Sequence, residues 1–226
     1  MTFATEDLAP LAQVLARSFP GLQSGMAANL EADGRLTAEG VGFTGLKGDV
    51  AGSPIAGRLA INEDGRIDGA LTVPRVAFAD LAALALGPVA PPAKGQIWSS
   101  QRFVQAAPPV IGKVELGFGQ LDVVDGMALT EGKLVLDLSP NGVTVSDVTG
   151  RFGGGSVHAT LKLQRQGSLA TLTANVGLKD VAAAALFASA RGEQPSGRLS
   201  GHMEAGSSGE SVATLVANMA GGGELR

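Results

Sequence analysis

One short pattern opens segment after segment of this chain: a glycine, a cationic residue and then an apolar residue. Glycine permits tight turns, and a polar residue followed by an apolar one begins the alternation of a half-buried strand. The recurrence therefore predicts short antiparallel strands joined by tight turns, and it brings no catalytic group with it. The seven copies are Gly34-Arg35-Leu36, Gly57-Arg58-Leu59, Gly65-Arg66-Ile67, Gly112-Lys113-Val114, Gly132-Lys133-Leu134, Gly150-Arg151-Phe152 and Gly197-Arg198-Leu199.

The composition agrees with this β interpretation and excludes several classes of protein. Hydrophobic residues make up 45% of the 226 residues, aromatic residues only 4%, and there are 33 glycines. The net charge of -4 argues against a nucleic-acid binder, and the absence of cysteine excludes disulfides and thiolate chemistry. We expect a mainly β protein: an extended, twisted antiparallel sheet that forms a groove or a partly closed layer, with a few short helices.

Hydrophobic periodicity divides the chain into two β subregions. Strand-like alternation occupies about 24–75 and 100–178 and returns at 197–205, and Asn141-Gly142 is the strongest hairpin signal. Helical spacing occurs at 6–18, 77–86, 181–190 and 211–219, and a proline-rich break covers 87–95. We therefore predict an N-terminal β subregion with flanking helices and a proline linker at 1–95. A second β subregion follows at 96–226, and both ends of the chain are interpreted as cuts through a longer protein.

The apolar face of such a sheet is larger than its helices can cover. Ten strands at about 4.8 Å spacing make a sheet roughly 48 Å wide, whereas the three later helices, each about 10 Å across, cover about 30 Å at best. Three outcomes would hide the remainder: the sheet curls on itself, other residues cover it, or it contacts something apolar such as acyl chains. Composition does not choose among them. The most apolar stretch, 76–86, is too short to cross a bilayer.

Histidines, serines and glycine-rich turns are all better explained by structure than by catalysis. His158 and His202 fall on the polar phase of their strands, which predicts exposed side chains and makes a poor zinc set. The glycines at 153–155 lack the lysine and the helix of a phosphate-binding loop. Ser211 is expected to cap a helix, because no base lies near it in sequence. We predict no catalytic residue, no cofactor and no metal site.

The cations of the recurring pattern allow two interpretations. They protect strand edges and keep the sheet soluble, or they line a rim that attracts anionic lipid headgroups. The residues concerned are Arg35, Arg58, Arg66, Lys113, Lys133 and Arg198.

Four stretches of the chain resemble the C-terminal region of AsmA-like envelope proteins, which are related to bridge-like lipid transfer proteins with a β-sheet groove. Residues 153–161 (GGGSVHATL) resemble the glycine-rich strand entry of that family, and 40–57 resemble its repeated strand-and-glycine pattern. Residues 98–103 (WSSQRF) are similar to its tryptophan-serine strand, and 206–225 to its serine-capped helix and closing glycine turn. Together the four stretches fall within about 34–226.

The resemblance implies part of a long β-sheet groove with an apolar interior that faces the periplasm. Family members carry an inner-membrane helix, which this sequence lacks, and are linked to phospholipid movement and outer-membrane integrity. No catalytic residues come with the family.

We interpret the chain as a non-enzymatic, periplasm-facing envelope protein fragment that binds or conducts phospholipid acyl chains along its apolar sheet face. One alternative is a scaffold or regulator of outer-membrane protein assembly, with a closed sheet and no lipid site. Another is a hydrolase, which would need a pocket joining His158 or His202 to a serine and a carboxylate. The side chains expected to face lipid are Leu134, Leu136, Leu161, Leu163, Leu172 and Val176.

Overall fold

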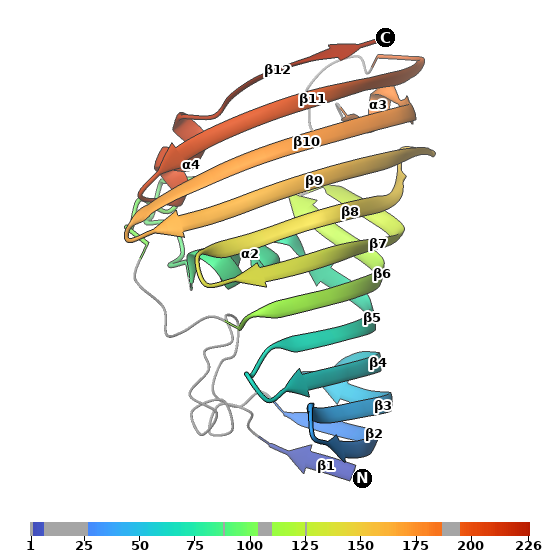
Figure 1. The fold of residues 1–226 in the computed structure, drawn as a ribbon. Helices are drawn as coiled ribbons and strands as arrows, with labels where there is room; N and C mark the ends of the chain where they lie inside the picture. The colour runs from blue at the N-terminus through green and yellow to red at the C-terminus, as the bar shows by residue number, and fades with distance from the viewer. Residues whose placement is uncertain (1, 7–26, 88, 104–109, 125, 187–194) are drawn as a thin grey trace.

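A computed structural model describes residues 2–6, 27–87, 89–103, 110–124, 126–186 and 195–226. The described residues contain twelve strands, which form one twisted sheet in the order of the sequence (Figure 1). The two edge strands, β1 and β12, lie at opposite ends of this order, so the described sheet is open. The predicted mainly β, antiparallel-dominated fold is therefore confirmed.

Strands from both predicted subregions belong to the same sheet. The first half contains β1 (Thr2–Thr5), β2 (Ala28–Thr37), β3 (Gly40–Val50), β4 (Ser53–Asn62) and β5 (Ile67–Ala77), followed by helix α2 (Phe78–Leu86). The second half contains β6 (Gly112–Val124), β7 (Met127–Ser139), β8 (Gly142–Phe152), β9 (Gly155–Gln166) and β10 (Leu169–Ala182). It ends with α3 (Ala183–Leu186), β11 (Arg198–Gly209), α4 (Val212–Ala217) and β12 (Ala220–Leu225).

Most predicted helices and turns are found near their predicted positions. The helix expected at 77–86 is α2, and the one expected at 211–219 is α4, whose first turn is held by a capping box between Ser211 and Thr214. Of the helix expected at 181–190, Ala183–Leu186 form α3, whereas the first two positions belong to β10, which continues to Ala182; residues 187–190 lie outside the described residues. The hairpin turn lies at Pro140 and Asn141, one residue earlier than predicted. The helix expected at 6–18 falls almost wholly outside the described residues.

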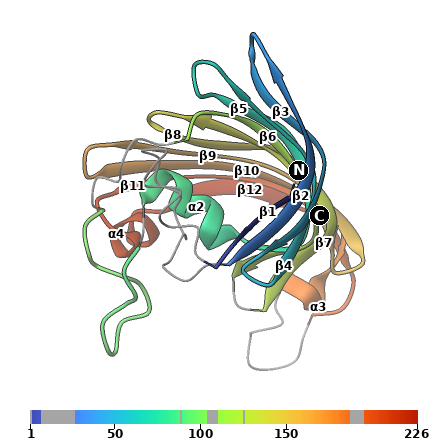
Figure 2. The ribbon, with the colours of Figure 1, turned by 90° about the horizontal axis from the view of Figure 1, so that it is seen from below.

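The pairing of β5 with β6 was not predicted. It is parallel, whereas the other strand pairs of the described sheet are antiparallel. Parallel neighbours need a crossover connection, and this connection contains α2. Figure 2 shows the sheet curving around α2 and α4, which lie on the same side of it. The crossover thus puts a helix on one face near the middle of the sheet.

Alternate side chains form three apolar rows that run across the strands on this face. The first row contains Leu36, Val41, Ile61, Ile67, Gly112, Leu138, Val143, Leu163 and Leu172. The second contains Phe43, Leu59, Gly69, Val114, Leu136, Val145, Leu161, Ala174 and Ala205. The third contains Leu46, Gly57, Leu71, Leu116, Leu134, Val148, Ala159, Val176 and Met203.

Bulges keep the apolar side chains on one face over these long strands. Glu131, Asp147 and Asp180 have φ angles of 50°, 51° and 57° and lie where the register of β7, β8 and β10 shifts. Each bulge inserts one extra residue into its strand. The alternation of apolar and polar residues along the sequence shifts by one position there, and the apolar side chains stay on the same face of the sheet. This is why Val145 and Val148, three residues apart, are both buried.

Two clusters of buried side chains stabilise the second half. The central cluster joins Leu81 of α2 to the apolar faces of β6–β8, with Val157, Leu178 and Val181 from β9 and β10. The second cluster contains Leu86, Phe103, Leu163, Ala170 and Leu215, and so joins α2 to α4. Helix α2 therefore contributes to both.

Candidate functional site

The apolar face is the first candidate site, and its middle part is closed. On β6–β8 all the side chains of the three rows are buried: Val114, Leu116, Leu134, Leu136, Leu138, Val143, Val145 and Val148. Leu134 is only 1% exposed. Leu134 and Leu136, two of the predicted lipid-facing residues, are thus covered by the protein itself.

The other predicted lipid-facing residues lie on β9 and β10. Leu163 is buried in the second cluster, and Leu172 packs against that cluster while remaining half-buried. Leu161 and Val176 are also half-buried and border the central cluster. Their neighbour in the third row, Met203 of β11, is 40% exposed. The structure therefore divides the predicted set into three buried and three half-buried side chains.

The same rows continue onto β2–β4, where they are less covered. Val41, Phe43, Leu59 and Ile61 are half-buried, and Leu36 is 81% exposed. Helix α2 packs against β5, β6, β8 and β9, α3 packs against β10, and α4 packs against β10 and β11. Within the described ranges, no helix packs on the apolar face of β2–β4 to a comparable extent.

Sequence reasoning did not select these residues, although their alternation is readable in the sequence. The predicted lipid-facing residues all come from the β subregion at about 100–178, in which the alternation is the more regular. Regular alternation of aliphatic residues is typical of the best-packed part of a sheet. Choosing residues by this alternation therefore identified the buried core rather than the less covered surface of β2–β4.

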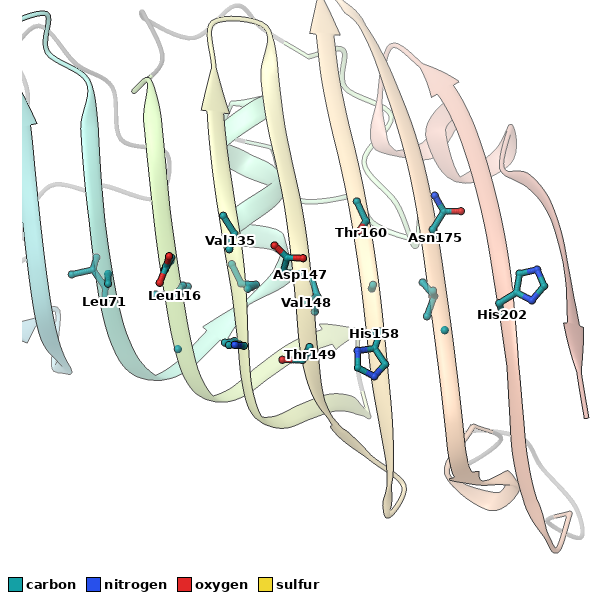
Figure 3. A pocket seen from close by; sticks show the side chains of 18 of the residues that line it. Leu71, Leu116, Val135, Asp147, Val148, Thr149, His158, Thr160, Asn175 and His202 are labelled. Atoms are coloured by element: carbon teal, nitrogen blue, oxygen red, sulfur yellow. The ribbon is translucent and has the colours of Figure 1, made fainter.

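The opposite, polar face has a shallow depression of about 1040 Å³ over β5–β11. In Figure 3 the side chains of Asp147, His158, Asn175 and His202 are drawn in this depression. His158 and His202 lie in register on either side of Gly177, so their backbones are about 9.6 Å apart. Both histidines are exposed, as their polar phase predicts.

This depression brings no recognisable catalytic or metal-binding set together. Histidines and carboxylates are present, but the residues that line it include no serine. Over the described part of the chain, no group of three or more His, Asp or Glu side chains is arranged to hold a metal ion. Ser211 is buried and caps α4, where its hydroxyl accepts a hydrogen bond from the Thr214 N–H at 3.2 Å.

The six cations considered for a headgroup-binding rim are exposed and do not form a rim around the apolar face. Arg35, Arg58, Lys113 and Lys133 alternate with members of the apolar rows, so they lie on the polar face. Arg66 lies at the β4–β5 turn, where its Nε is 4.0 Å from Asp64 Oδ2. Arg198 forms an ion pair with Asp180 at the β10 bulge. This placement agrees with the interpretation that they keep the sheet soluble.

One exposed ion pair joins β5 to β6 beside α2. Arg75 Nε donates to Asp122 Oδ2 at 2.5 Å, and Gln120 Nε2 donates to Asp122 Oδ1 at 2.6 Å. These hydrogen bonds, the one from Arg75 above all, hold the pKa of Asp122 below its usual range. The pair links β5 to β6, the two parallel strands whose junction we call the parallel seam.

None of the described helices is both long and apolar enough to span a bilayer. Comparison of the chain with protein-family models, with curated proteins and with solved structures gives no match.

Proposed function

We propose that this chain is a non-enzymatic lipid-binding protein that holds phospholipid acyl chains against the apolar face of its sheet. One observation carries the proposal: the three apolar rows extend beyond α2 onto strands where their side chains remain partly exposed. Soluble monomers rarely leave a contiguous aliphatic surface in water, and each methylene that leaves water on such a surface contributes about 0.8 kcal/mol.

The dimensions suit an acyl chain. Along β3 the three apolar rows run from Val41 to Leu46, five residues at about 3.3 Å each, which gives a surface roughly 16 Å long. A bilayer core of about 30 Å is two acyl chains thick, so one chain spans about 15 Å. The surface is aliphatic apart from Phe43 and carries no charge along its rows, which suits a hydrocarbon better than a polar ligand.

The resemblance to AsmA-like envelope proteins suggests the rest of the proposal. It favours phospholipid as the ligand, a periplasm-facing location beside the inner membrane, and a role in outer-membrane integrity. These features rest on the four sequence stretches and not on the geometry of the sheet.

The test is lipid binding by a variant that places a charge on the uncovered surface. Ile61→Glu puts a carboxylate in the first apolar row, and Ala60→Glu puts the same group on the polar face of the same strand. Binding of a fluorescent phospholipid from phosphatidylethanolamine–phosphatidylglycerol vesicles should weaken at least about tenfold for Ile61→Glu, because the acyl chain would desolvate the charge. Ala60→Glu should bind like the wild type.

Two results would refute the proposal. The first is a folded wild-type chain that neither retains phospholipid after purification nor binds the probe. The second is equal loss of binding in both variants while both remain folded. Either result would favour the scaffold role, in which the sheet serves protein partners.

A further inference from the structure

The apolar face is interrupted where β5 and β6 run parallel. The crossover between them carries α2 over the sheet, where it packs against β5, β6, β8 and β9 (Figure 2). An antiparallel hairpin at this position would have left the face open, because its turn stays at the end of the strands. The interruption is therefore a consequence of the topology.

Helix α2 is firmly attached to the sheet. Leu81 and Leu86 are 6% and 5% exposed and belong to different clusters of buried side chains. At the end of the helix, Arg165 Nη1 from β9 donates to the Leu86 carbonyl oxygen at 2.6 Å, and the Gly87 N–H donates to the Ala83 carbonyl oxygen at 2.9 Å. Removing α2 would expose both leucines and break the bond from Arg165.

No open path crosses this seam along the three rows. All their members on β6–β8, including Gly112, are buried. On either side the rows become partly exposed. The first surface is formed by Val41, Phe43, Leu59 and Ile61 on β3 and β4. The second is formed by Leu161, Val176 and Met203 on β9–β11.

We propose that α2 divides the apolar face into two acyl-chain surfaces that do not communicate, so that the chain holds lipid at two places and does not conduct it along the sheet. This inference rests on the proposed function and goes beyond it. A continuous groove would let one lipid slide from β2 to β11. The seam requires each lipid to enter and leave from the side on which it is bound.

The experiment uses phosphatidylethanolamine–phosphatidylglycerol vesicles that contain a phospholipid with a photoreactive diazirine on its acyl chain. After illumination, cross-linked peptides should fall into two groups, one on β3–β4 and one on β9–β11. Peptides from the row positions of β7, which include Leu134 and Leu136, should carry no cross-link. Native mass spectrometry of the wild type should show up to two lipids per chain.

Variants at each surface separate the two-surface arrangement from a continuous one. Ile61→Glu should reduce the first group of cross-links about tenfold and leave the second unchanged. Met203→Glu should do the reverse, and Ala60→Glu and His202→Glu, on the polar face, should change neither. If Ile61→Glu fails to fold, Leu36→Glu at the 81% exposed end of the same row replaces it.

The inference is overturned if either variant removes both groups, if cross-links occur beneath α2, or if only one surface is labelled. Absence of any cross-link in the folded wild type is a different result. It would refute the proposed function itself.

Discussion

Strands β2–β5 and β6–β8 belong to one sheet and alternate apolar and polar side chains in the same way, yet only the second group is sealed. Leu134 on β7 is 1% exposed, whereas Leu36 on β2 is 81% exposed, and both belong to the apolar face. The difference follows the central cluster, to which α2 contributes Leu81 while it packs against β5, β6, β8 and β9. Alternation decides which face is apolar, and the connections between strands decide how much of that face is covered.

The largest effect should come from shortening a leucine in each region. Leu134→Ala removes a fully buried side chain from the central cluster and should lower the free energy of unfolding by about 2–5 kcal/mol. Leu59→Ala removes a half-buried side chain from the other region and should cost less than half as much. Urea unfolding followed by circular dichroism measures both. Equal losses would mean that β2–β5 are covered as well as β6–β8.

The parallel seam itself should be sensitive to a single methyl group. Gly112 has a φ of 146°, and a Cβ at this position would lie 1.8 Å from the Ile67 carbonyl oxygen of β5. Gly112→Ala should therefore destabilise the protein by at least about 1–3 kcal/mol and loosen the contact between the two regions.

Gly95→Ala is the matched control for the seam. Gly95 also has a positive φ, 86°, but beyond its two neighbours in the sequence no atom lies within 4 Å of its added Cβ. Hydrogen exchange of the β5 and β6 amides should increase in Gly112→Ala and stay unchanged in Gly95→Ala. Unchanged exchange in Gly112→Ala would show that the seam tolerates a wider separation of the strands.

A smaller effect is expected at α4, which helps to cover the second region. Ser211→Ala removes the hydroxyl that accepts from the Thr214 N–H, and loss of an N-cap costs about 1 kcal/mol. Ser208→Ala, at an exposed position of β11, should change the stability by less than about 0.5 kcal/mol. Thermal unfolding of the two variants makes the comparison. Identical melting temperatures would mean that the capping box contributes little to the cover over β10 and β11.

The strands and their faces were largely predictable because both depend on local signals. Glycine turns and alternation place β6–β10 near their observed positions, and Ser211 is an N-cap that sequence rules recognise. The parallel β5–β6 pair was not predictable in this way, because the sequence signals of hairpins are local whereas a crossover depends on packing over the whole sheet.

The candidate site was predicted less well for the same reason. Leu134 and Leu136 were assigned to the correct face, but they are buried rather than exposed. They belong to a cluster that includes Leu81 of α2, a nine-residue helix more than forty residues earlier in the chain. Phe43 and Ile61 lie on the same face and are only half-buried, and none of the helices in the described ranges packs over them to a comparable extent. The local sequence pattern does not distinguish the buried pair, Leu134 and Leu136, from the half-buried pair, Phe43 and Ile61.

The smallest effect concerns the ion pair that joins the two regions at the seam. The hydrogen bond from Arg75 lowers the pKa of Asp122, so the carboxylate form is favoured in the folded state. Asp122 therefore stabilises the fold at a pH above its unfolded pKa of about 3.9, and this contribution is lost as the pH falls through the lower, folded pKa. Because the Arg75 side chain is exposed, the contribution is small and is screened by salt.

An NMR titration of the Asp122 carboxyl carbon measures this directly. Arg75→Gln should move the pKa of Asp122 upward, toward its ordinary value, and the remaining bond from Gln120 should keep the shift incomplete. Unfolding at pH 7 and pH 3 should then show a smaller difference between the two conditions in Arg75→Gln than in the wild type. A pKa of Asp122 that does not respond to Arg75→Gln would mean that the pair does not persist in solution. The seam would then depend on the backbone pairing of β5 with β6 and on the packing of α2, and the two regions would be joined without help from charge.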